Sequence, residues 1–100
     1  MKPIQDSILW TSDELSKVIG VKIESTWLCN GIEFDSRKVK KGNIFFALPG
    51  TKLDGHNFIK DAVKLGAVAL IVNKTFNSKI YNNRLIKVDD VYKTLILLAN

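Results

Sequence analysis

One hundred residues, 46% of them hydrophobic and 25% charged, are enough for one hydrophobic core and too few for two domains. No apolar run approaches the ~20 residues of a membrane span, and residues 1–25 carry polar groups where a secretory signal would be apolar, so we expect a cytoplasmic protein. A single cysteine, Cys29, and a single histidine exclude an internal disulfide and a zinc site built from this chain alone.

The net charge of +5 comes mainly from thirteen lysines, which are scattered from Lys2 to Lys93 among ten acidic residues. A nucleic-acid surface would gather its basic residues and interleave them with exposed aromatic side chains. We therefore expect a solvated surface and no nucleic-acid partner. A stand-alone module that binds RNA or another acidic partner remains the second hypothesis.

The segment WTSDELSKVIG, residues 10–20, predicts a helix with both ends marked. Thr11 and Glu14 fit the capping box, and Trp10 and Leu15 occupy the positions of a hydrophobic staple. Gly20 is expected to end the helix. The expected buried side consists of Leu15, Val18 and Ile19.

Three strands are expected next. Residues 21–29 and 31–35 alternate in hydropathy around the turn signal Asn30-Gly31, which predicts a hairpin. The continuous apolar run NIFFALPG, residues 43–50, indicates a strand buried on both faces.

A helix and a further strand follow. Phe58, Ile59, Ala62 and Val63 fall on one helical face, and Gly66 ends the helix before the apolar strand AVALIV, residues 67–72. Residues 44–72 therefore form a strand-helix-strand unit, expected to be parallel and right-handed.

The remaining chain is expected to form a surface connection at 73–84, a strand at 85–88 and a helix from Asp89 or Asp90 that reaches the last residue without a C-cap. The predicted fold is a single α/β domain with a small mixed sheet flanked by helices. We expect the chain to be truncated before a further domain.

Two polar segments follow predicted strands: Asp35-Ser36-Arg37, and GTKLDGH at residues 50–56. Open parallel sheets bind ligands beyond the carboxyl ends of their strands. About eight residues between the two strands are too few for a helical crossover, so the sequence leaves open whether both segments reach the same edge.

The chemical groups of these segments suit binding of a base, a sugar or a phosphate more than catalysis. They are backbone N–H groups at Gly50 and Gly55, the hydroxyls of Ser36 and Thr51, the carboxylates of Asp35 and Asp54, and the cations Arg37 and Lys52. The chain has no glycine-rich phosphate loop and no recognisable nucleophile–histidine–carboxylate order, so it lacks an ATP site of its own.

Structural roles compete with these interpretations. Asp35 and Arg37 can form an ion pair that braces a turn, Ser36 can be a turn former, and Asp54 can cap the following helix. His56 has no partner base or metal ligand visible in the sequence. Lys38, Lys40 and Lys41 suit a solvated loop.

The segment GIEFDSRKVKKGNIFFALPGTKLDGHNFIKDAVKLGAVALIV, residues 31–72, resembles the N-terminal domain of the Mur ligases. The matching pattern is a strand ending in D-S-R, then V-x-x-G, an F-F-A-L strand, D-G-H-x-F, and a helix ending in G-A. The opening segment WTSDELSKVIG is most similar to members that add the D-alanyl-D-alanine dipeptide, and members that add the third amino acid share D-S-R and D-G-H.

The resemblance implies ATP-dependent amide-bond formation in peptidoglycan synthesis. In the family, this domain holds the uridine end of a UDP-N-acetylmuramoyl-peptide, a central domain binds ATP with Mg²⁺, and a C-terminal domain binds the incoming amino acid. Residues 1–100 would then be the N-terminal substrate-binding domain, with the other two domains as partners in the same chain and no cofactor or catalytic residue of its own.

The implied substrate contacts are Ser36, Gly50, Thr51, Lys52 and Leu53. The residues implied to support them are Asp35, Arg37, Asp54, Gly55 and His56. The aromatic and thiol side chains expected in the core are Trp27, Cys29, Phe34, Phe45 and Phe46, although one aromatic ring could stack on the uracil.

Overall fold

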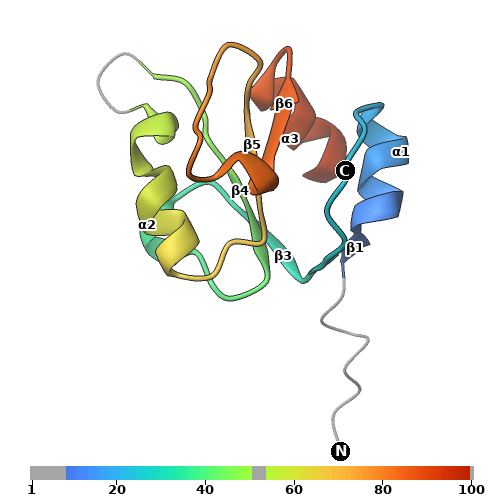
Figure 1. Cartoon of the computed structure of the whole chain (residues 1–100), viewed down its shortest axis with the longest axis horizontal. Helices are drawn as coiled ribbons and strands as arrows, with labels where there is room; N and C mark the ends of the chain where they lie inside the picture. The colour runs from blue at the N-terminus through green and yellow to red at the C-terminus, as the bar shows by residue number, and fades with distance from the viewer. Residues whose placement is uncertain (1–8, 51–53, 100) are drawn as a thin grey trace, which may run out of the picture.

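A parallel sheet of four strands with helices on both faces forms the centre of the molecule (Figure 1). The structure is a computed structural model, and it describes residues 9–50 and 54–99. The strands are β1 Trp10–Thr11, β2 Leu28–Cys29, β3 Gly31–Glu33, β4 Asn43–Phe46, β5 Ala69–Asn73 and β6 Leu85–Val88. The helices are α1 Ser12–Ile19, α2 Ile59–Lys64 and α3 Val91–Ala99, with short 3₁₀ helices η2 Ser36–Lys38, η3 Gly55–Phe58 and η4 Asn82–Arg84.

The sheet has the order β3-β4-β5-β6, and each neighbouring pair is parallel. Ile44 and Phe46 of β4 pack on the side of α1 and α3, whereas Phe45 packs on the side of α2. Because both faces are covered, every residue of β4 is buried. The predicted doubly buried strand and the parallel strand-helix-strand unit are therefore confirmed.

The structure confirms the helix that the capping box and Gly20 predicted, as α1. The Thr11 hydroxyl accepts the backbone N–H of Glu14, and the Glu14 carboxylate accepts the backbone N–H of Thr11. Gly20 ends the helix in the left-handed conformation, with φ of 71°. The predicted buried side is wrong at one position: Leu15 is fully buried, but Val18 is 42% exposed.

The predicted hairpin of residues 21–29 and 31–35 is wrong. Strand β2 pairs with β1 in a separate antiparallel sheet, and β3 pairs in parallel with β4. Asn30 is not in the left-handed conformation that a tight hairpin turn needs, since no non-glycine residue of the described segments has positive φ. Its side chain instead donates to the carbonyl of Lys41 and accepts from the amide of Asn43.

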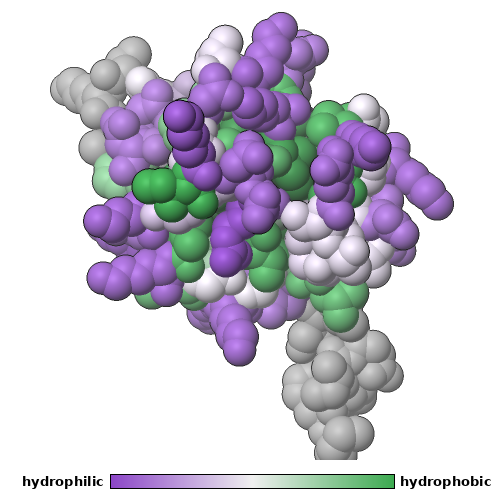
Figure 2. All heavy atoms as spheres, in the orientation of Figure 1, coloured by the Kyte–Doolittle hydropathy of each residue, from purple (hydrophilic) through white to green (hydrophobic). Residues whose placement is uncertain are grey.

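The α/β class with flanking helices is confirmed, but parallel and antiparallel pairing occur in two separate sheets rather than in one mixed sheet. The remaining elements follow the prediction, because β6 and α3 occupy the expected strand and helix, and Asp90 accepts the N–H of Lys93 at the start of α3. No helix of the described segments is both long and apolar enough to cross a membrane. Hydrophilic side chains cover most of the face in Figure 2.

Candidate nucleotide-binding site

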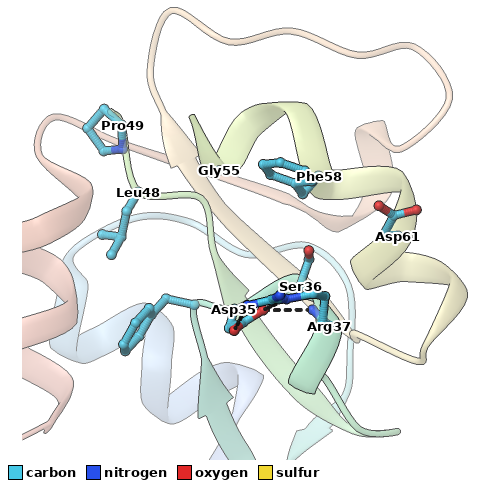
Figure 3. A pocket seen from close by; sticks show the side chains of 9 residues that line it. Asp35, Ser36, Arg37, Leu48, Pro49, Gly55, Phe58 and Asp61 are labelled. Carbon is cyan, nitrogen blue, oxygen red and sulfur yellow. Dashed lines mark hydrogen bonds and ion pairs between the residues drawn. The ribbon is translucent and has the colours of Figure 1, made fainter. Parts of the chain in front are cut away.

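A pocket of about 620 Å³ lies where β3 and β4 end. Because these strands are parallel, their carboxyl ends share one edge of the sheet, which resolves the question that the sequence left open. The volume is in the range of small-ligand pockets. The lining residues, drawn in Figure 3, are Phe34, Asp35, Ser36, Arg37, Leu48, Pro49, Gly55, Phe58 and Asp61.

The end of β3 is turned by local hydrogen bonds. The carboxylate of Glu33 accepts the backbone N–H groups of Phe34 and Asp35, both at 3.1 Å. This turn leaves Phe34 57% exposed at the pocket, so its predicted place in the core is wrong. The sequence pattern failed here because the pairing with β4 stops at Glu33, one residue before the apolar run ends at Phe34.

Asp35 and Arg37 form the ion pair that was one of the two predicted alternatives. The Asp35 carboxylate accepts the backbone N–H of Arg37 at 3.0 Å and both its Nε and Nη2 groups, at 3.1 and 3.0 Å. These hydrogen bonds, above all those from the side chain, lower the pKa of Asp35 to about 2. The carboxylate also raises the pKa of Arg37. The pair therefore stays charged and fixes the start of η2.

Ser36 is the buried member of this segment, with 7% of its surface exposed. Its side chain points from η2 toward Phe58, into the pocket (Figure 3). A hydroxyl can both donate and accept a hydrogen bond, which suits the edge of a base or sugar. Its neighbours Asp35 and Arg37 shape the backbone, whereas the hydroxyl of Ser36 is directed into the pocket.

The opposite wall of the pocket comes from the end of β4 and from η3. The backbone N–H of Gly55 donates to the carbonyl of Leu48 at 2.8 Å. A Cβ atom at Gly55 would lie 2.7 Å from the Leu48 nitrogen and 2.9 Å from two backbone atoms of Ala47. Glycine is therefore required by the close approach of two backbones, and this approach brings Phe58 to the pocket.

Asp54 caps η3, as the capping alternative predicted, by accepting the backbone N–H of His56 at 2.9 Å. This hydrogen bond lowers the pKa of Asp54, against the opposite effect of burial. His56 does have a partner: its Nδ1 lies 2.7 Å from the Asp54 carboxylate, and its Nε2 accepts the backbone N–H of Asn73 at 3.0 Å.

The predicted site residues thus fall into four groups. Asp35, Ser36, Arg37 and Gly55 meet in the pocket, and Asp54 and His56 support its wall. Gly50 is exposed and outside the lining, and Thr51, Lys52 and Leu53 lie outside the described residues. Leu48 and Asp61 were not predicted as site residues, and Phe58 was assigned to a helix face, because no local pattern reports which residues a neighbouring strand brings together.

Comparison with known proteins agrees with this architecture. Residues 29–96 match the family described as "Mur ligase family, catalytic domain". The chain belongs to the Mur ligase family. It is 38% identical over 94 residues to the UDP-N-acetylmuramoyl-tripeptide–D-alanyl-D-alanine ligase of Rickettsia prowazekii, an alignment that covers 92% of this chain and 20% of the relative.

Other relatives carry out a different step. The UDP-N-acetylmuramoyl-L-alanyl-D-glutamate–2,6-diaminopimelate ligase of Aquifex aeolicus is 46% identical over 65 residues, which cover 65% of this chain and 13% of the relative. This Mur ligase chain thus spans about a fifth or less of the length of these relatives.

Solved structures show the same fold. A crystal structure of MurF from Acinetobacter baumannii has a TM-score of 0.71 at 26% identity and covers 88% of this chain and 20% of its own. MurF ligase from Thermotoga maritima, in complex with ADP, has a TM-score of 0.56 at 38% identity and covers 68% of this chain and 15% of its own.

Proposed function

We propose that this domain binds the uridine end of a UDP-N-acetylmuramoyl-peptide for an ATP-dependent, amide-bond-forming ligase of peptidoglycan synthesis. The observation that carries the proposal is the pocket at the shared edge of β3 and β4, into which Ser36 points. Such a domain positions a long substrate by its nucleotide, so that remote binding energy orients the reacting carboxylate. The domain itself supplies no catalytic group.

The charges of the pocket favour the nucleoside over its phosphates. Among the described lining residues, Arg37 is the one cation, and Asp35 already holds it in a bidentate pair. Asp61 adds a second carboxylate. A diphosphate would be repelled there, whereas a neutral base and ribose would not.

The aromatic rings of Phe34 and Phe58 give this pocket the apolar surface that a base requires. We therefore assign the uracil and ribose to the pocket and the diphosphate to the region outside it. The hydroxyl of Ser36 would hydrogen-bond the uridine.

Titration of the ¹⁵N-labelled chain with UDP tests the assignment. We expect amide shifts to concentrate at Ser36, Gly55 and Phe58, and Ser36→Ala to raise the Kd about two- to twelvefold, the value of one hydrogen bond to an uncharged group. Ser25→Ala is the matched control, because the Ser25 hydroxyl donates to the carbonyl of Asn83, away from this pocket. Equal effects of the two substitutions would refute the contact with Ser36.

For the ligase step, we propose addition of D-alanyl-D-alanine to the UDP-N-acetylmuramoyl-tripeptide. Support comes from α1, whose sequence resembles that of the ligases that add this dipeptide, and from the Rickettsia prowazekii relative, whose alignment covers 92% of this chain. Addition of the third amino acid, a diamino acid or lysine, is the alternative, supported by the higher identity of shorter matches such as 46% over 65 residues.

An assay of the ligase that carries this domain separates the two steps. Phosphate release is followed with UDP-N-acetylmuramoyl-tripeptide plus D-alanyl-D-alanine, and with the muramoyl-dipeptide plus a diamino acid, each with ATP and Mg²⁺. We expect turnover with the tripeptide. Turnover with the dipeptide alone would select the alternative and leave uridine binding unaffected.

A further inference from the structure

The backbone of β5 has an unusual hydrogen-bond partner where β4 ends. Strand β5 lies between β4 and β6, and the carbonyl of Ile71 on its β4 side accepts the N–H of Ala47. Asn73, two residues later, has its N–H on that same side, but β4 ends at Phe46 and its chain diverges. The Nε2 atom of His56 accepts this N–H at 3.0 Å, in place of a strand carbonyl.

This bond determines the tautomer of His56. Because Nε2 accepts a hydrogen bond, the neutral ring carries its proton on Nδ1, which donates to the Asp54 carboxylate at 2.7 Å. The side chain is only 11% exposed, and its ring packs against Phe76 with centroids 5.1 Å apart. Asp54, His56 and Asn73 therefore form one connected bridge from the start of η3 to the end of β5.

The bridge holds one wall of the pocket. Helix η3 has four residues, too few to be stable by itself, and two of them, Gly55 and Phe58, line the pocket. Two hydrogen bonds hold it in place: Gly55 donates to the carbonyl of Leu48 in the chain after β4, and His56 accepts from Asn73 at the end of β5. Loss of the second would leave η3 bonded to the chain after β4 and would remove its hydrogen bond to β5.

We propose that His56 is a positioning residue for nucleotide binding, which acts through Gly55 and Phe58 and does not touch the ligand. The proposal rests on the uridine-binding function proposed above. It assigns to the histidine of D-G-H a role in geometry: His56 takes the place of a strand carbonyl where the chain after β4 diverges from β5, and so holds η3, which lines the pocket, beside the sheet.

The tautomer gives a direct spectroscopic test. His56 is the one histidine of the chain, so the two ring nitrogens of a ¹⁵N-histidine-labelled sample are assigned without ambiguity. Above the range in which histidine is protonated, we expect a protonated Nδ1 and an unprotonated Nε2. A protonated Nε2 would overturn the proposal, because that atom could not accept the N–H of Asn73.

Binding of UDP to the 100-residue chain tests the functional part. His56→Asn keeps a polar group near the position of Nδ1 but cannot reach Asn73, and we expect it to raise the Kd about tenfold or more, as displaced contact groups do. His56→Gln can place its amide oxygen near the position of Nε2, and we expect it to restore most of the affinity. Ile86→Val, in the core on the opposite face of the sheet, is the control for a general loss of stability.

Each outcome is decisive, provided that amide spectra show every variant to be folded. A raised Kd for His56→Asn with near-normal values for His56→Gln and Ile86→Val supports the positioning role. Wild-type binding with an unchanged Kd in His56→Asn refutes this role and leaves the proposed function intact. Absence of UDP binding by the wild-type chain refutes the proposed function, and the positioning role with it.

Discussion

Replacement of Gly55 by alanine tests how tightly the two walls of the pocket are joined. The new Cβ would lie 2.7 Å from the Leu48 nitrogen and 2.9 Å from the carbonyl carbon and Cα of Ala47. All three are backbone atoms of the chain leaving β4, so no side chain can rotate to relieve the contact. Relief would require η3 to move away, which stretches the 2.8 Å bond from Gly55 to Leu48.

Overpacking of this kind costs ~1–3 kcal/mol, and we expect the upper end because the neighbours are backbone. Gly20→Ala is an informative control: its Cβ would meet nothing within 4 Å, but its φ of +71° is left-handed. There the left-handed conformation costs ~1–2 kcal/mol, and in both variants the lower entropy of the unfolded alanine chain returns ~0.4–1 kcal/mol. Gly55→Ala should therefore destabilise the protein more than Gly20→Ala.

Urea unfolding of both variants and the wild type measures these differences in free energy. For a domain of this size, a loss of ~3 kcal/mol would lower the Tm by more than about 10 °C. UDP binding should weaken in Gly55→Ala and stay unchanged in Gly20→Ala, since only Gly55 lies in the pocket wall. A Gly55→Ala variant within ~0.5 kcal/mol of the wild type would show that the two backbones are not in fixed contact.

Three further outcomes are expected. The pKa of Asp54 is lower in the folded than in the unfolded protein. The ionised carboxylate therefore stabilises the fold above its unfolded pKa of about 3.9, and this stabilisation is lost as the pH falls through its folded pKa. The free energy of unfolding of Asp54→Asn should therefore depend less on pH in this acid range. Thr11→Ala removes half of the capping box and should cost ~1 kcal/mol in urea unfolding, whereas a change below the error of the method would refute the cap. Calorimetric titration of this chain with ATP should show no tight binding, and sub-micromolar affinity would contradict the domain assignment.

The success of the sequence predictions depended on how local their physical signals were. Helix α1 was predicted to its ends because its cap, Thr11 with Glu14, and its terminator, Gly20, lie within one short segment. The hairpin prediction failed because Asn30 forms its hydrogen bonds with the chain at Lys41 and Asn43, more than ten residues away. A turn signal reports only what a residue can do locally, and distant partners decided otherwise.

The same limit applies to the candidate site. The polar segment around Ser36 and the glycine at position 55 were identified from sequence, since both follow predicted strands at their carboxyl ends. Phe34, Leu48 and Asp61 were not assigned to the pocket, because their place there depends on the parallel pairing of β3 with β4 and on the position of α2. Strand direction is a non-local property that about eight connecting residues could not determine.

The geometry also divides the motif residues by the way in which they should act. Asp35 fixes the start of η2, Gly55 permits the contact of two backbones, and His56 completes the hydrogen bonding of β5, so all three shape the pocket through the backbone. Among the polar motif residues that the structure describes, Ser36 alone points an uncharged polar group into the pocket. Substitution of the shaping residues should therefore lower stability and affinity together, whereas Ser36→Ala should lower affinity with little change in the free energy of unfolding. Under the proposed function, such a motif would bind through one side chain, and its other residues would hold that side chain in position.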